Sequence, residues 1–261
     1  MTRAAGRPVS NPGDSIERRH ERYLEQARWT AEIRRRLTAR LSKEETARLL
    51  EVGAGTGAVT ADLEVEFPES LVLAIDLDHE ACRFGARGVP GARWSCGDAH
   101  ALPYPTSSVD AVLFHFVLLW LEDPAGALAE AWRVTRPGGW VAALAEPDHA
   151  ARLDYPDVLA RLGSRQTEAL AVQGADVRLG RKLRGLFAAV GFDEIEAGVL
   201  GSEWRSDARG PESEWETLRQ DLELTVPAAD MDALQEFDRQ AWAEGERVLF
   251  VPTFYALGRV R

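Results

Sequence analysis

Short, continuous apolar runs recur between residues 47 and 147 and are separated by stretches of helical periodicity. Runs of this length without polar alternation are typical of parallel strands that are buried on both faces of a sheet. Strands that alternate with helices predict an open, doubly wound α/β sheet with right-handed crossovers. The predicted strands lie at 47–52, 71–76, 92–96, 109–116 and 140–147.

The segments between these strands predict helices at about 57–66, 78–87 and 124–136. Asp123 and Pro124 open the third of them as a favourable N-cap and first helical residue. After Pro147 the pattern predicts helices near 155–172 and 179–190, a strand at 192–200, a helical insert at 211–244 and a strand at 253–260.

A long amphipathic helix is predicted over residues 15–41, and Asp14 with Glu17 resembles a capping box at its start. Residues 1–14 are polar and rich in Pro and Gly, so we expect them to be flexible. Seven of the eight arginines in this segment crowd the positions between its apolar residues, and we interpret them as a solvated face paired with acidic neighbours. They are Arg18, Arg19, Arg22, Arg34, Arg35, Arg36 and Arg40.

The length of 261 residues predicts one large domain with an elaboration. We expect a cap helix within 15–45 and a Rossmann-like domain over 46–261 that has helices on both faces of its sheet. Further cap segments are expected inside that domain at 149–190 and 201–245.

A formal net charge of −11 excludes electrostatic attraction to nucleic acid or to an anionic membrane. Cys82 and Cys96 lie outside any zinc-binding or disulfide spacing. The longest apolar run, at 111–121, is too short to cross a bilayer and contains a histidine. We therefore expect a soluble cytoplasmic protein without a metal site.

Residues 49–57 read LLEVGAGTG, the end of a predicted strand followed by glycines at every second position. Glycines at such a turn adopt backbone angles closed to other residues and let a ligand lie against the main chain. Two interpretations fit this loop. Gly53, Gly55 and Ala58 satisfy the dinucleotide fingerprint, and Asp76 has about the spacing of its ribose-binding acid. An adenosine-containing methyl donor fits the same loop.

Downstream motifs separate the two interpretations. In chain order, the motifs are EVGAGTG at 51–57, Asp76 after the second strand, Gly97-Asp98-Ala99 after the third, VDAV at 109–112 and RVTRPGGW at 133–140. On these motifs, about residues 45–200 resemble the class I S-adenosylmethionine-dependent methyltransferases. The resemblance implies a seven-stranded, mostly parallel sheet of order 3-2-1-4-5-7-6 whose last strand is antiparallel. The subgroup to which the chain is most similar methylates small molecules such as quinones, sterols and polyketides.

The resemblance implies a donor site for S-adenosyl-L-methionine, with S-adenosyl-L-homocysteine as product. In it, Glu51 and the glycine loop support the methionine end, and Asp76 accepts hydrogen bonds from the ribose hydroxyls. Asp98 accepts a hydrogen bond from the adenine amino group, and the main chain after the fourth strand faces the donor's α-amino group. The implied contacts are Glu51, Gly53, Ala54, Gly55, Gly57, Asp76, Leu77, Asp98, Ala99, Phe114 and His115.

Methyl transfer from a sulfonium depends mainly on in-line alignment in a dry cavity, and a base is needed only if the acceptor must lose a proton. Candidates for that base are His115 after the fourth predicted strand and Glu146, Asp148 and His149 after the fifth. We take His115 as the candidate catalytic residue, because an imidazole near its ordinary pKa can accept a proton.

The acceptor is expected to be a small apolar or aromatic molecule, bound by parts of the chain outside the common sheet. Aromatic side chains in these parts predict a pocket for it. The candidate acceptor residues are Tyr23, Trp29, Glu146, Asp148 and Trp204, and the protein is expected to be a monomer or a homodimer.

Two alternatives remain open from the sequence. An NAD(P)-dependent oxidoreductase would use the glycine loop and Asp76 but leaves Gly97-Asp98-Ala99 unexplained. A non-catalytic protein that binds S-adenosylmethionine would retain the donor site without transferring a methyl group.

Overall fold

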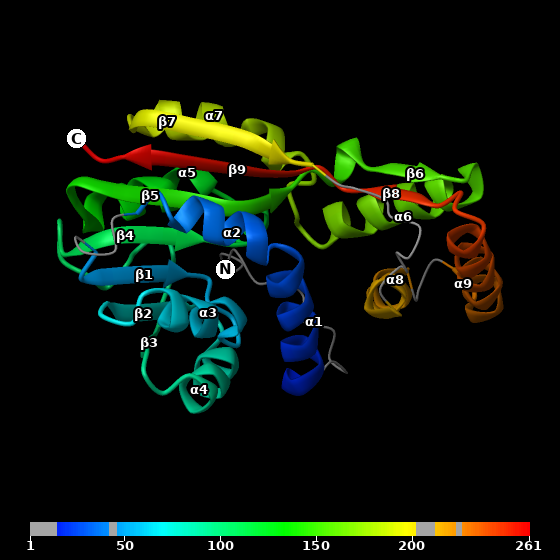
Figure 1. The fold of residues 1–261 in the computed structure, drawn as a ribbon, viewed down its shortest axis with the longest axis horizontal. Coiled ribbons are helices and arrows are strands. Elements are labelled where there is room, and N and C mark those ends of the chain that lie inside the picture. Colours follow the sequence, from blue (N-terminus) through cyan, green and yellow to red (C-terminus); the bar gives the residue numbers. More distant parts are fainter. Residues whose placement is uncertain (1–14, 42–45, 202–211, 223–225) are drawn as a thin grey trace, which may run out of the picture.

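The computed structural model describes residues 15–41, 46–201, 212–222 and 226–261 (Figure 1). Its main sheet has seven strands in the order β3-β2-β1-β4-β5-β9-β7. Strand β9 is antiparallel to both neighbours, and the other pairings are parallel, which confirms the predicted topology. The strands are β1 Arg48–Val52, β2 Leu71–Asp76, β3 Arg93–Cys96, β4 Val109–Phe114, β5 Thr135–Pro147, β7 Asp193–Leu200 and β9 Thr253–Arg259.

Successive residues of the central strands enter two different hydrophobic cores, one on each face of the sheet. In β4, Val112 and Phe114 belong to one core, whereas Ala111 and Leu113 belong to the other. All four side chains are buried. Alternation between two apolar faces explains why the strands read as continuous apolar runs.

Helices cover both faces of the sheet. Residues of α5 (Pro124–Val134) and α7 (Leu179–Val190) belong to one core, and residues of α3 (Ala58–Glu66) belong to the other. Helix α4 (His79–Gly88) contacts β2 and β3. The helices predicted at these places are therefore present.

The single N-terminal helix predicted over 15–41 is wrong, because two helices lie there. Helix α1 spans Ile16–Trp29, α2 spans Ala31–Thr38, and Thr30 between them has φ −94° and ψ 2°. The Thr30 hydroxyl bonds the Gln26 carbonyl, a local contact that competes with regular helix geometry. Ser15 is the N-cap of α1, and the expected cap Asp14 lies outside the described residues.

A separate cap unit extends beyond the end of β7 and the start of β9 (Figure 1). Strands β6 and β8, of three residues each, pair in an antiparallel way and were not predicted. The helices of the same unit enclose a third hydrophobic core around Trp215 and Met231. The unit consists of β6 Leu153–Tyr155, α6 Asp157–Val172, α8 Glu212–Leu222, α9 Ala228–Ala243 and β8 Val248–Phe250.

Buried charges join the parts of the cap unit. The Asp154 carboxylate pairs with Arg152 and with Arg247, and Arg247 also pairs with Asp238. The indole N–H of Trp215 donates to Asp238 at 2.9 Å. Buried ion pairs persist when every partner is satisfied, so this network fixes the arrangement of β6, β8 and α9.

Candidate functional site

The glycine loop after β1 folds over the end of β2. Gly53 and Ala54 donate their N–H groups to the Ile75 carbonyl at 2.8 and 3.0 Å, and Gly53 has φ +74°. A Cβ atom on Gly53 would lie 2.3 Å from Cγ2 of Val117. The chain's own packing therefore requires glycine at this position, in addition to any ligand.

Helix α1 lies directly on this loop. A Cβ atom on Gly55 would lie 3.1 Å from the Tyr23 ring, and His20 Nδ1 is 2.9 Å from Thr56 Oγ1. Arg19 also donates to Asp78 in the loop after β2, at 2.7 Å. The candidate acceptor residue Tyr23 thus covers the glycine loop itself.

Asp76, the last residue of β2, connects two loops at the carboxyl edge of the sheet. Its Oδ2 accepts from the Gly55 N–H at 2.7 Å and its Oδ1 accepts from the Asp78 N–H at 2.8 Å. Burial raises the pKa of Asp76, while these two backbone bonds oppose the rise. A carboxylate has about four lone pairs, so Asp76 can accept further hydrogen bonds from hydroxyl groups.

Asp98 follows β3 at the same edge, since Cys96 and Asp76 are partners in the β2–β3 register. Its Oδ1 accepts from the His100 main-chain N–H at 2.9 Å, which is the main reason why the pKa of Asp98 is lowered. Its side chain is half exposed. Leu77 is exposed beside Asp76, and Ala99 is half-buried beside Asp98.

Glu51 lies beneath the glycine loop and has no open path to solvent. Its carboxylate is buried and accepts from the Thr60 hydroxyl at 2.6 Å. Burial raises the pKa of Glu51 to about 7. Its position suits support of the loop from within the core.

His115 follows β4, and its imidazole contacts the break between α1 and α2. Its Nε2 lies 2.7 Å from Thr30 Oγ1, and Thr30 also accepts from Arg34 at 3.0 Å. Burial, together with the Arg34 cation, lowers the pKa of His115 to about 3. The imidazole is therefore neutral at neutral pH and accepts a proton weakly, which disfavours it as a general base.

Two arginines that the sequence assigned to a solvated face are buried instead. Arg34 is 2% exposed and pairs with Asp62, and Arg19 is 7% exposed and pairs with Asp78. The interpretation of a solvated face is wrong for these two, because their carboxylate partners come from segments distant in sequence. Thr30 and Arg34 are site residues that the sequence reasoning missed.

The candidate carboxylates at the end of β5, Glu146 in the strand and Asp148 just after it, are both fully buried. Glu146 accepts hydrogen bonds from the Val117, Leu118 and Leu119 N–H groups at 3.0 to 3.2 Å. Burial raises its pKa to about 7. Asp148 forms a two-pronged ion pair with Arg181. Both groups are engaged inside the protein, which favours structural roles over contact with an acceptor.

Aromatic side chains gather where α1 ends near the carboxyl end of β4. Trp29 is 59% exposed and stacks on Phe116 with 6.2 Å between ring centroids. The Phe116 ring in turn meets His115 edge-on at 4.7 Å. Trp204, another candidate acceptor residue, lies outside the described residues.

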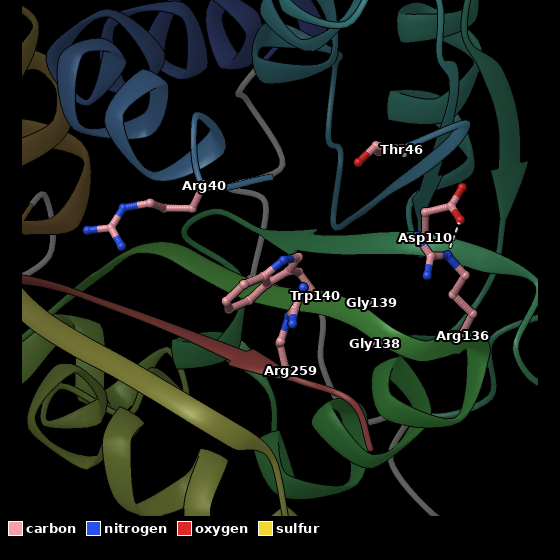
Figure 2. A pocket seen from close by; sticks show the side chains of 8 residues that line it. All are labelled: Arg40, Thr46, Asp110, Arg136, Gly138, Gly139, Trp140 and Arg259. Atoms are coloured by element: carbon pink, nitrogen blue, oxygen red, sulfur yellow. Dashed lines mark hydrogen bonds and ion pairs between the residues drawn. The ribbon is translucent and has the colours of Figure 1, made fainter. Parts of the chain in front are cut away.

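A polar hollow of about 80 Å³ lies at the opposite, amino edge of the sheet, as Figure 2 shows. Its charges are paired internally, Arg136 with Asp110 and Arg40 with Glu196, and Arg259 lies over the Trp140 ring. It is therefore separate from the candidate site. Its lining is Arg40, Thr46, Asp110, Arg136, Gly138, Gly139, Trp140 and Arg259.

Within the described ranges, no group of three or more His, Cys, Asp or Glu side chains could hold a metal ion. No helix in the same ranges is both long enough and apolar enough to cross a bilayer.

The geometry places the glycine loop, Asp76, Asp98 and the end of β4 along one edge of the sheet. The methyltransferase domain family matches residues 50–143, which carry all of these features. The match is to a methyltransferase domain, and it agrees with the resemblance of the motifs to class I S-adenosylmethionine-dependent methyltransferases. A match to a methyltransferase domain over the glycine loop favours the methyl-donor interpretation of this loop over the dinucleotide interpretation.

Curated relatives include two proteins that are named as methyltransferases. The chain is 39% identical over 147 residues to malonyl-[acyl-carrier protein] O-methyltransferase of Halorhodospira halophila, covering 50% of each chain. It is 32% identical over 122 residues to trans-aconitate 2-methyltransferase of an Azoarcus species, covering 47% of this chain and 48% of the relative. The chain thus spans about half the length of these relatives.

Solved structures share the fold at low sequence identity. A methyltransferase from Thermotoga maritima, described as a possible histamine N-methyltransferase, has TM-score 0.56 and 17% identity, covering 93% of this chain and 95% of its own. The [4+2]-cyclase SpnF has TM-score 0.55 and 20% identity, covering 98% of this chain and 87% of its own. These structures support the fold alone.

Proposed function

We propose that the protein transfers a methyl group from S-adenosylmethionine to a small, apolar or aromatic acceptor by in-line displacement. The observation that carries the proposal is the convergence of the glycine loop, Asp76 and Asp98 at one edge of the sheet, under helix α1. Relatives with names that specify trans-aconitate and quinone biosynthesis support a small acceptor.

The residues at this edge fit the donor chemically. Asp76 keeps lone pairs for ribose hydroxyls beyond the two backbone bonds that it accepts. Asp98 would accept from the adenine amino group, with Leu77 and Ala99 beside the ring. The main chain of the glycine loop and of Phe114 and His115 would hold the methionine end, with Glu51 as support. When bound, S-adenosylmethionine supplies a methyl group that is already activated on a sulfonium sulfur.

The chain's own contribution would be alignment and the exclusion of water. Positioning of this kind can supply roughly 7–11 kcal/mol of barrier lowering. Tyr23 and α1 would seal the loop, and neutral His115 would act as a hydrogen-bonding group rather than as a base, since its pKa is about 3.

We propose further that α1 and α2 (within 15–45), the segments at 149–190 and the insert at 201–245 form a cover over donor and acceptor. Contacts between these parts support it. Arg22 of α1 donates to Gln220 of α8 at 2.9 Å. The next residue of α8, Asp221, accepts from Gln166 of α6 at 3.1 Å. Helix α8 therefore connects the N-terminal helix α1 to α6 within the cap unit, and Trp29 would face the acceptor.

Calorimetric titration with S-adenosylmethionine, S-adenosylhomocysteine and NAD tests the donor site. We expect binding of the first two and none of NAD. Tight NAD binding without a response to the methyl donor would overturn the proposal. Mass spectrometry of copurified ligands, followed by a transfer assay with a labelled methyl group, then tests the acceptor class.

A non-catalytic or differently catalytic donor-binding protein is the second candidate, because SpnF has this fold and is described as a cyclase. Donor binding without transfer to any acceptor in the assay would favour it.

We also predict a cytoplasmic protein that is monomeric or homodimeric, to be checked by fractionation and light scattering.

A further inference from the structure

Glu146 is a buried carboxylate whose contacts are not explained by donor or acceptor binding. It lies near the end of β5, and its side chain is completely buried. Oε1 accepts from the Val117 N–H at 3.0 Å and the Leu118 N–H at 3.1 Å, and Oε2 accepts from the Leu119 N–H at 3.2 Å. All three donors belong to the segment that follows β4.

These N–H groups open the short 3-10 helix η1 (Leu118–Trp120), whose own N-cap, Val117, makes no side-chain capping bond. The first N–H groups of a helix lack partners within it and carry partial positive charge. A carboxylate from the neighbouring strand supplies those partners here, so Glu146 ties η1 to the end of β5.

The segment held in this way packs against the glycine loop. The Val117 side chain occupies the space beside Gly53, with Cγ2 2.3 Å from where a Cβ atom would lie. Phe116 donates its N–H to the Ala145 carbonyl at 2.9 Å and has φ +56°. A non-glycine residue persists in that strained region only when its surroundings fix it.

We infer that Glu146 is a positioning residue, which holds residues 115–119 against the glycine loop and thereby sets donor affinity without touching the donor. This inference rests on the proposed function of the site. It replaces the expectation that Glu146 contacts the acceptor or serves as a base.

The variant Glu146→Gln tests the inference, because it keeps the volume but turns one acceptor oxygen into an N–H₂ donor that faces an N–H group. We expect the affinities for S-adenosylmethionine and S-adenosylhomocysteine to fall by the same factor, roughly tenfold. Hydrogen exchange at the Val117, Leu118 and Leu119 amides should accelerate, while the acceptor KM stays unchanged.

Asp238→Asn is the matched control, since Asp238 is a buried carboxylate that accepts from Trp215 and Arg247 in the cap unit. It should lower the melting temperature and leave donor affinity unchanged. If Glu146→Gln fails to fold, Val117→Ala is the second variant. It removes the side-chain contact with Gly53, so it should weaken donor binding while the amides of residues 117–119 stay protected from exchange.

Wild-type donor affinity together with unchanged amide exchange in Glu146→Gln would overturn the inference. If the wild-type protein binds no S-adenosylhomocysteine, the proposed function fails. Amide exchange at residues 117–119 still decides in that case whether Glu146 holds the segment, so the two failures are distinguishable.

Discussion

The donor edge of the sheet and the cap unit are held together by different kinds of interaction. At the donor edge, Asp76 accepts hydrogen bonds from main-chain N–H groups, and Gly53 allows close packing of two loops. In the cap unit, side-chain ion pairs join Asp154, Arg247 and Asp238. Main-chain contacts depend on few side chains, so the donor edge can keep its shape while much of its sequence changes.

This difference parallels the comparison with known proteins. The family match covers residues 50–143, which contain the donor edge, and ends before the cap unit begins at β6. We therefore expect donor recognition and acceptor recognition to be separable by mutation. Substitutions of Asp76, Arg247, His115 and Trp29 test that separation.

Replacement of Asp76 by Ala should have the largest effect on donor binding. It removes a charged acceptor for two ribose hydroxyls, each bond contributing about 1.5–3 kcal/mol, so affinity should fall at least roughly 100-fold. Calorimetry with S-adenosylhomocysteine measures this. Asp193→Ala, which removes an exposed carboxylate paired with Arg261, should bind normally. Unchanged affinity with an unchanged circular dichroism spectrum would remove Asp76 from the site.

Replacement of Arg247 by Met should destabilise the cap unit and spare the donor edge. Removing one partner of a buried ion pair costs about 3–5 kcal/mol, because uncompensated charges remain on Asp154 and Asp238. Hydrogen exchange in 153–172 and 228–250 should accelerate without loss of donor affinity. Arg219→Met breaks a more exposed pair with Asp232 and should cost less than about 1 kcal/mol. If Arg247→Met and Arg219→Met both lost donor affinity to the same extent, the donor edge and the cap unit would not be separable.

The pH dependence of stability should report on His115, which lies where α1, α2 and β4 meet. Its pKa is about 3 in the folded protein against an ordinary value of 6.5, so its contribution to stability is complete above pH 6.5 and is lost as pH falls. The wild type should therefore lose up to about 1.4 kcal/mol per pH unit relative to His115→Gln in this range.

Chemical denaturation of both proteins at several pH values between 6.5 and 4.5 measures that difference. Glu51 and Glu146 have raised pKa values of about 7 and contribute in the opposite direction, with stability lost as pH rises toward 7. They are present in both proteins and cancel in the comparison. A difference that does not vary with pH would mean that His115 titrates normally.

Replacement of Trp29 by Ala should have the smallest effect, confined to the acceptor. Aromatic pairs such as Trp29 and Phe116 contribute about 0.5–1.5 kcal/mol, so the acceptor KM should rise by up to roughly tenfold while donor affinity stays constant. Phe237→Ala removes an exposed aromatic residue of α9 and serves as the control. Weaker donor binding in the Trp29 variant alone would place this residue in the donor site.

The sequence predicted the main sheet well because its strands are buried on two faces and therefore read as continuous apolar runs. Motifs at strand ends also identified Asp76 and Asp98, since parallel strands bring their carboxyl ends to one edge. The short strands β6 and β8 were missed, because segments of three residues are too short to show a strand pattern. In β6 the buried charge of Asp154 also interrupts the apolar sequence.

Other parts of the site depend on contacts between segments that are distant in sequence. Arg34 reads as a surface residue of a helix until the fold brings Asp62 beside it. Glu146 reads as a carboxylate at the active edge until η1 is placed against it. Local periodicity cannot report such partners, whereas it reports burial of an entire strand.

The position of β9 has a consequence for synthesis on the ribosome. This strand lies between β5 and β7, yet it is translated more than fifty residues after β7 ends at Leu200. Until then β5 presents an unpaired edge next to apolar residues such as Ala142 and Ala143. Unpaired edges of this kind invite association between chains, so nascent protein should need protection until residues 253–259 emerge and complete the sheet.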